Sequence, residues 1–154
     1  MIEIEIADAA WTAAAPDADG LARQATGAVA ALGAEGSIAV LLTGDDAVRR
    51  LNARFRGKDA PTNVLAFPAA AHAGGHLGDI ALAFGVCARE AAEQGKTLAD
   101  HLRHLVIHGV LHLLGYDHQA EDQARRMEAV ERQLLAALGV PDPYAEGDHV
   151  QRRR

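Results

Sequence analysis

Two kinds of β-strand are predicted by the pattern of apolar and polar positions in the first half of the chain. Isoleucine and glutamate alternate over Ile2–Ile6, a period of two that is typical of a strand with one buried face. The run Ser37–Thr43 is apolar throughout its middle, which is typical of a central strand covered on both faces. Shorter strands are predicted at residues 63–67 and 78–83, and the glycine-rich stretch between them, residues 69–77, is predicted to be a loop.

Five helices are predicted from apolar positions that recur three and four residues apart, at residues 19–32, 45–55, 86–94, 97–114 and 120–138. The helix at 97–114 has Thr97 as its N-cap and is apolar on most of its circumference, so we expect it to be the buried central helix. The last helix is amphipathic, and its inward positions are Met127, Val130, Leu134, Leu135 and Leu138.

A single domain is the simplest organisation for 154 residues that contain no internal repeat and no linker. Residues 1–140 are expected to form this domain and residues 141–154 a polar, frayed tail. The only cysteine is Cys87, which excludes a disulfide within the chain and fits a reducing compartment. Because neither a signal peptide nor a run of roughly 18 apolar residues is apparent, we expect a cytoplasmic protein without a membrane partner.

The net charge of −6 taken alone disfavours a nucleic-acid partner. Five of the 15 basic residues nevertheless fall within ten positions that contain no acid, namely Arg49, Arg50, Arg54, Arg56 and Lys58. For Arg49 and Arg50, a solvated helix face and a binding role are equally consistent with the sequence. The other three lie at the helix end and in the loop beyond it, where they are better placed to meet a phosphate.

Three histidines at the end of the central helix form a candidate metal site. His108 and His112 lie about 40° apart on one helical face, one turn from each other. A continued helix would turn His118 away from them, but Gly115 is suited to the left-handed conformation that ends a helix. Three protein ligands with a fourth position open to water are typical of catalytic zinc, although imidazole also suits copper, iron and nickel. The alternative for each histidine is a buried, neutral ring.

The spacing H-x3-H-x5-H is that of metzincin metalloproteases, with one departure. Gly109 stands where those enzymes carry the glutamate that acts as general base, which argues against peptide hydrolysis. His101 and His104 share the same helical stripe but lie too far along the axis, about 12 Å between His104 and the second predicted ligand. His72 and His76, in the predicted loop, are not favoured as additional ligands.

These stretches resemble the YbeY family in several blocks. Residues 51–68, Leu-Asn-Ala-Arg-Phe-Arg-Gly-Lys-Asp-Ala-Pro-Thr-Asn-Val-Leu-Ala-Phe-Pro, are similar to its first signature, and Gly78-Asp79-Ile80 to a short second block. Residues 108–118 match its signature H-G-x-L-H-L-x-G-Y-D-H at every fixed position. Residues 127–139, followed by Asp142-Pro143-Tyr144, are also similar to the C-terminal helix of the family. One departure is Ala66, where a serine is common, so any contact of that hydroxyl is missing here.

The resemblance implies an α+β fold with a small mixed sheet of about four strands, packed with helices around the metal-bearing helix. It implies a metal-dependent endoribonuclease that cuts single-stranded RNA, matures the 3′ end of small-subunit rRNA and acts in ribosome quality control. Its partners would be rRNA, the small ribosomal subunit and assembly factors. It also implies an arginine associated with activity at Arg56. Arg54 and Lys58 are expected to be RNA-binding residues because of their charge and position, not because of the resemblance. The implied cofactor is one Zn²⁺ bound by His108, His112 and His118.

The residues and the resemblance converge on phosphodiester hydrolysis. Three neutral imidazoles leave the ion its full charge, which favours ionisation of a bound water near neutral pH or polarisation of a phosphoryl oxygen. Arg56, with Arg54 or Lys58, would stabilise the charge that builds on the phosphate. The general base stays open between a metal hydroxide, the RNA 2′-hydroxyl and another side chain. Asp117 is either an orienting group behind a ligand or a solvent-facing turn residue.

Alternatives to a ribonuclease stay open in the sequence. One is a ribosome-assembly factor whose metal only braces the fold, and a less favoured one is a metalloprotease. Aromatic residues, at 4 % of the chain, are scarce for a protein that stacks single-stranded bases. The nearest candidates are Phe55, Phe67 and Tyr116, and core packing explains the two phenylalanines better.

Overall fold

A four-stranded mixed sheet carries helices on both faces in the computed structural model, which describes residues 1–33, 35–70 and 75–145. The elements, in chain order, are β1 Ile2–Ile6, α1 Ala10–Ala14, α2 Ala18–Ala30, β2 Ser37–Thr43, α3 Asp45–Arg56, β3 Val64–Pro68, β4 His76–Ala83, α4 Phe84–Glu93, α5 Leu98–Leu113 and α6 Glu121–Ala137. The strand order is β1-β2-β4-β3, with β3 antiparallel to β4 and the other pairs parallel. The predicted α+β class and mixed sheet are confirmed.

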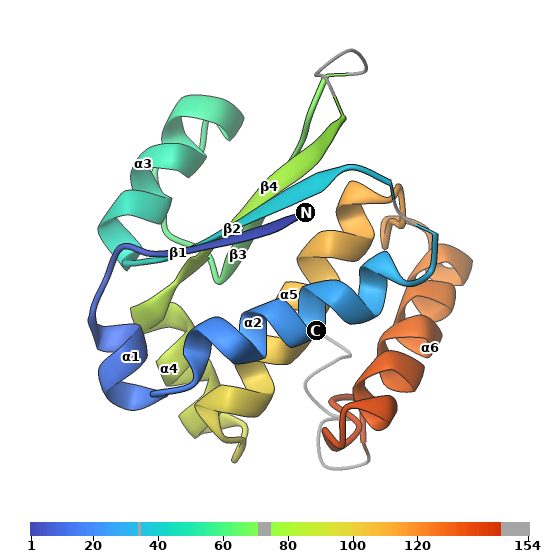
Figure 1. Ribbon diagram of the computed structural model, residues 1–154. Coiled ribbons are helices and arrows are strands. Elements are labelled where there is room, and N and C mark those ends of the chain that lie inside the picture. Colours follow the sequence, from blue (N-terminus) through green and yellow to red (C-terminus); the bar gives the residue numbers. More distant parts are fainter. Residues whose placement is uncertain (34, 71–74, 146–154) are drawn as a thin grey trace.

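Alternate residues of the central strand β2 face two different cores. Ile38, Val40 and Leu42 are buried in the larger core, together with residues of α2 and α5. Leu41 packs in a smaller core beneath α3, against the fully buried Val48. Figure 1 shows α3 on one side of the sheet and α2 and α5 on the other. The continuous apolar run of β2 thus reflects a strand that is covered on both faces, as predicted.

Helix α5 is the centre of the larger core. It contacts α2, α4, α6, β3 and β4, and its side chains Leu102, Val106, Ile107, Val110 and Leu111 are fully buried. The Thr97 hydroxyl accepts a hydrogen bond from the Asp100 backbone N–H at 3.0 Å, which confirms the predicted N-cap. Among the described residues, no helix is both long and apolar enough to cross a bilayer.

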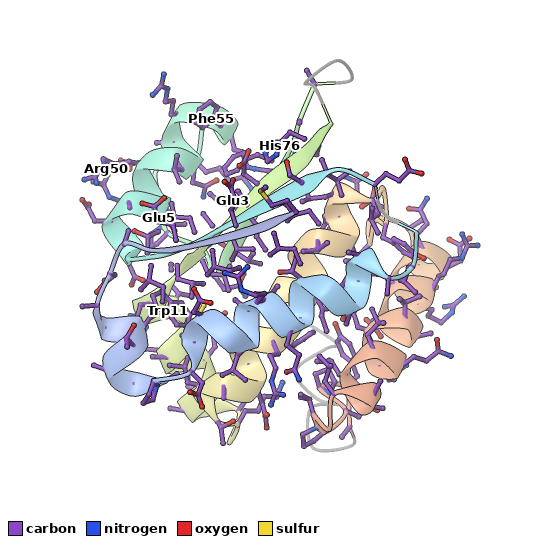
Figure 2. All side chains as sticks on the ribbon, viewed as in Figure 1. Glu3, Glu5, Trp11, Arg50, Phe55 and His76 are labelled. Carbon is purple, nitrogen blue, oxygen red and sulfur yellow. The ribbon has the colours of Figure 1, made fainter. Side chains whose placement is uncertain are left out.

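Helix α1 was not predicted from the sequence. It is mostly alanine and has only one large apolar residue, Trp11, so it shows no helical period. The indole is fully buried, its Nε1 donates a hydrogen bond to the Thr43 carbonyl at 2.9 Å, and its ring meets Phe84 edge-on at 5.3 Å between centroids. Figure 2 shows Trp11 below the sheet, between α1 and the strands. A single long-range anchor therefore explains a helix that local pattern does not reveal.

The predicted loop is shorter than expected because β4 begins at His76. The His76 Nδ1 lies 2.7 Å from the Ser37 hydroxyl and its Nε2 lies 3.2 Å from Asp79 Oδ1, so contacts with the neighbouring strand and with β4 itself order this residue. His76, which the sequence did not favour as a ligand, does not belong to the histidine cluster of residues 108, 112 and 118. His72 lies outside the described residues.

The first part of the predicted frayed tail is packed rather than free. Pro143 is buried, and the ring of Tyr144 lies edge-on against His104 at 5.5 Å between centroids. Asp142 Oδ1 accepts a hydrogen bond from the Tyr144 backbone N–H at 2.8 Å and so shapes the turn that brings the tyrosine inward. The long-range contact with α5 explains why the polar composition of this stretch was misleading.

Close packing of β4 on α5 predicts a strong effect of one added methyl group. A Cβ at Gly78 would lie 2.6 Å from Leu113 Cδ2 and 2.7 Å from the Phe67 carbonyl oxygen. We expect Gly78→Ala to lower the free energy of unfolding by about 1–3 kcal/mol, as overpacking does. The measurement is urea unfolding followed by circular dichroism.

Gly20→Ala is the matched control, because no atom of the described residues lies within 4 Å of its Cβ position on α2. It should raise the free energy of unfolding by about 0.4–1 kcal/mol. Equal effects of the two substitutions would contradict the proposed close packing.

Candidate metal centre and cleft

Helix α5 and the turn after it bring the three predicted histidines together. One ring nitrogen from each of His108, His112 and His118 lies within 4.8 Å of the corresponding nitrogens of the other two histidines. The Nε2 atoms of His108 and His112 are 3.2 Å apart, as expected for two rings that point at one position. This arrangement fits a tetrahedral metal ion with three imidazole ligands, because the donors are of the right kind and converge. The three histidines can therefore hold a metal ion.

The turn that delivers His118 begins at Gly115, whose φ of 97° is in the left-handed region. The Tyr116 backbone N–H donates to the Leu111 carbonyl at 3.0 Å and closes the end of the helix. Asp117 Oδ1 then accepts hydrogen bonds from the backbone N–H groups of His118, at 2.6 Å, and Gln119, at 3.2 Å. Asp117 thus shapes the backbone beneath His118 and is not hydrogen-bonded to its ring.

A buried carboxylate that the sequence analysis missed lies directly behind His108. Glu131 of α6 is fully buried, and its Oε2 lies 2.6 Å from His108 Nδ1. Its Oε1 lies 3.2 Å from His104 Nε2 and accepts a short hydrogen bond from the Tyr144 hydroxyl. Glu131 lies four residues after Met127 and four residues before Leu135, so all three belong to the same buried stripe of α6. A carboxylate inside this apolar stripe was the signal available in the sequence.

The pKa of Glu131 is low despite burial. Burial alone would raise it, but the hydrogen bonds from His104 and His108 outweigh that effect and hold the pKa at about 2. Burial lowers the pKa of His104, against the opposing effect of Glu131. Burial, reinforced by His108 and His118, also lowers the pKa of His112. His112 is therefore neutral near pH 7, the form in which an imidazole binds a metal.

A second acid–histidine pair supports the opposite end of α5. Glu90 of α4 accepts hydrogen bonds from His101 Nε2 at 2.9 Å and from Asn63 Nδ2 at 3.1 Å. Burial would raise the pKa of Glu90, but the bonds from His101 and Asn63 lower it below its usual value. Asn63 also caps the start of β3, since its Oδ1 accepts from the Val64 N–H at 2.6 Å. This network fixes the first residue of β3, where the strand forms a wall of the site.

The histidines open into a cleft of about 970 Å³. Its walls include β3 and the loop before it, and the turn from Gly115 to Gln119. Arg56 and Lys58 also line this cleft, whereas Arg54 does not. The structure therefore brings two of the three predicted basic residues together with the metal candidates. The guanidinium of Arg54 lies instead over the Phe55 ring, at 5.2 Å from its centroid.

Arg56 is held in place from two sides. Its Nη2 donates a hydrogen bond to the Ala66 carbonyl at 2.7 Å, and its guanidinium lies 5.7 Å from the centroid of the Phe67 ring. Two other basic residues of α3 are paired with acids: Arg49 with Asp46 and Asp59, and Arg50 with Asp46. The basic stretch therefore divides into two arginines paired with acids, Arg54 over the Phe55 ring, and two cations at the cleft.

A second groove, of about 1010 Å³, lies on the side of the sheet that carries α3. Glu3, Glu5 and Asp79 line it together with Arg56, which lies between the groove and the histidine cleft and lines both. Figure 2 shows the two glutamates on this side beside α3. No histidine lines the groove. Three carboxylates against one arginine would repel a phosphate backbone, whereas two cations and one carboxylate, Asp117, line the histidine cleft, so that cleft is the better site for a polyanion.

The residue after the first histidine is tightly packed against the sheet. A Cβ at Gly109 would lie 3.2 Å from both Ile80 Cγ2 and Val64 Cγ2. Any side chain at this position would have to push these two residues apart. The absence of the metalloprotease glutamate is therefore linked to the close approach of α5 and the sheet, and the metalloprotease alternative gains no support.

Comparison with known proteins shows which family the chain belongs to. The family model described as Endoribonuclease YbeY matches residues 6–139. The chain belongs to the YbeY family. A relative from Maricaulis maris named Endoribonuclease YbeY is 61 % identical over 113 residues, which cover 73 % of this chain and 71 % of that protein. Another, from Paramagnetospirillum magneticum and of the same name, is 50 % identical over 157 residues, 94 % and 96 % of the two chains.

The fold is also shared with a solved structure. The solution structure of TM1509 from Thermotoga maritima superposes with a TM-score of 0.60 and covers 95 % of this chain and 97 % of that one. The two sequences are 24 % identical, so the likeness establishes the shared fold alone.

The buried acid–histidine contacts predict acid sensitivity of the metal-free protein. Because the pKa of His104 and His112 is lowered in the fold, the unfolded chain binds more protons below pH 6.5 and stability is lost as the pH falls. For Glu131 and Glu90 the folded pKa is also lowered, so their stabilisation is present above pH 4.5 and is lost as the pH falls towards 2. Urea unfolding in chelator should give a lower free energy of unfolding at pH 5.5 than at pH 7.5, and a still lower one at pH 4. A free energy that is constant from pH 7.5 to 5.5 would contradict this account.

Proposed function

We propose that this chain is a zinc-dependent endoribonuclease that cuts single-stranded RNA. The observation that carries the proposal is the convergence of His108, His112 and His118 in one cleft with Arg56 and Lys58. Relatives that share the family are named endoribonucleases, which supports the same reaction class. In the cell, we propose 3′-end maturation of small-subunit rRNA, with the small ribosomal subunit as partner.

The three histidines would hold the zinc ion as neutral ligands. When bound, the ion supplies a Lewis acid and an ionisable water close to the phosphate. The lowered pKa of His112 keeps that ligand available near neutral pH. Gly109 provides no general base, so proton transfer falls to another group at the cleft or to the RNA 2′-hydroxyl.

Arg56 would bind and orient the scissile phosphate. One guanidinium N–H is used by the Ala66 carbonyl, and a guanidinium has five, so others are left to donate to phosphate oxygens. Lys58 has no ion pair with an acid among the described residues and would add positive charge along the RNA backbone. Arg54, outside the cleft lining, would contact RNA only beyond the reacting phosphate.

The cleft offers one aromatic side chain to an unstacked base. Tyr116 lines the cleft beside the histidines. Phe55 and Phe67 instead pack against each other at 5.5 Å between centroids, and both line the groove on the α3 side of the sheet. Of the three aromatic candidates, Tyr116 is therefore the one placed to stack on a base of single-stranded RNA.

Metal content is the first test of the proposal. After zinc loading and removal of free metal, we expect about one zinc ion per native chain by atomic absorption. His112→Ala removes one of three ligands and should lose most of the zinc at the same loading. His76→Ala is the matched control, since His76 lies outside the histidine cluster and should leave the zinc content unchanged. No zinc in the native chain would contradict the proposed site.

Cleavage of an end-labelled RNA with a single-stranded segment tests the activity. The native chain should cut it, chelator should abolish cutting, and added zinc should restore it. Arg56→Ala should lower the rate by about 10²–10³-fold, the usual effect of losing one charge-stabilising donor. Arg50→Ala should cut at the native rate, because Arg50 is paired with Asp46 and does not line the cleft.

The two arginine variants also discriminate against the other functions. Equal cleavage by all variants would indicate a contaminating nuclease. RNA binding without cleavage by a zinc-loaded native chain would support a ribosome-assembly factor whose metal braces the fold. Both outcomes would overturn the ribonuclease proposal.

A further inference from the structure

Glu131 is a buried charge that core packing does not explain. Its neighbours on the inner stripe of α6, Met127 and Leu135, are apolar and buried to the same degree. Taking a carboxylate out of water costs several kcal/mol unless it is paired and hydrogen-bonded. An apolar residue would join α5 to α6 without this cost, so the carboxylate must make contacts that an apolar residue cannot.

The contacts of Glu131 fix the direction of three hydrogen bonds. A carboxylate only accepts, so each of its partners must donate. His108 donates from Nδ1 to Oε2 at 2.6 Å, while His104 Nε2 and the Tyr144 hydroxyl donate to Oε1. The His104 Nδ1 is buried without a partner in the described structure. Tyr144 and His104 thus hold one carboxylate oxygen in place, and the other oxygen is directed at His108.

The hydrogen bond from Nδ1 determines the tautomer of His108. A neutral imidazole carries one proton, so a proton on Nδ1 leaves the lone pair on Nε2. The Nε2 of His108 is the atom that lies 3.2 Å from His112 Nε2, inside the histidine cluster. The carboxylate therefore presents the lone pair of His108 to the position where an ion would bind.

We infer that Glu131 is a positioning residue that sets the tautomer and ring orientation of His108 for metal binding, and that Tyr144 and His104 hold Glu131 in that role. The inference rests on the proposed metal site. His108 is thus oriented by α6 before an ion arrives.

Glu131→Gln tests this role with little change in shape. An amide has a single acceptor oxygen, so it cannot accept from His108 and from the donors at the other oxygen position at once. We expect the zinc dissociation constant, measured by competition with a chromophoric chelator, to rise about 10–100-fold. Tyr144→Phe removes one of the donors that hold Glu131 and should raise it by a smaller factor.

Glu90→Gln is the matched control. Glu90 also accepts a hydrogen bond from a histidine of α5, His101, but that histidine lies outside the metal cluster. The control should lose stability to urea, as Glu131→Gln should, and yet keep the native zinc dissociation constant within about twofold. If the two variants have the same zinc affinity as the native chain, Glu131 only joins the helices and the inference is wrong.

The tautomer itself is measured in the metal-free protein by the ring ¹⁵N chemical shifts of His108. The native chain should show a protonated Nδ1 and an unprotonated Nε2, and Glu131→Gln should show a mixture or the reverse. This readout does not depend on the metal. Failure of the native chain to bind zinc would overturn the proposed function, whereas an unchanged tautomer in Glu131→Gln would overturn only the positioning role.

Discussion

The close approach of α5 to the sheet is the constraint on which the site depends. Gly78 on β4 and Gly109 on α5 leave no room for a side chain between the helix and the strands. This contact buries the apolar circumference of α5 and fixes the position of its last two turns, which carry two of the three histidines. It also fixes those histidines relative to β3, the strand whose Ala66 carbonyl holds Arg56. Metal candidates and phosphate-binding candidate therefore share one rigid support.

Charge is distributed unevenly between the two sides of the sheet. Three carboxylates line the groove on the α3 side, Lys58 lines the cleft with the histidines, and Arg56 lies between the two and lines both. The paired arginines of α3 contribute little to either. A net charge of −6 is therefore compatible with a polyanionic ligand, because the potential that such a ligand meets is local. Overall charge was a poor guide to the charge that lines the cleft, and Arg56 and Lys58 within the basic stretch 49–58 were a better one.

The sequence predicted features that are local and missed those that arise between distant segments. Long periodic runs predicted most helices and strands, and the histidine cluster was visible because its members lie within residues 108–118. Helix α1 depends on a hydrogen bond from Trp11 to Thr43, which no local pattern reports. Glu131 acquires its contacts only when α6 packs on α5, and Tyr144 only when the chain turns back after α6. Residue types alone could not predict that Lys58 lines the cleft and Arg54 does not, because this depends on where α3 ends and on the direction the chain takes after it.

The short span of the histidine cluster has a consequence for how an ion would be held. A metal that joins distant segments stabilises a fold largely by closing a long loop. The three histidines instead lie within residues 108–118, which are already ordered by the end of α5 and the turn at Gly115. The core around α5 is built by apolar packing and requires no such closure. His118 lies at the exposed side of the cluster, so ligand exchange can begin there while the two helical histidines stay in place. If an ion binds here, we therefore expect it to be able to leave and be replaced while the chain stays folded.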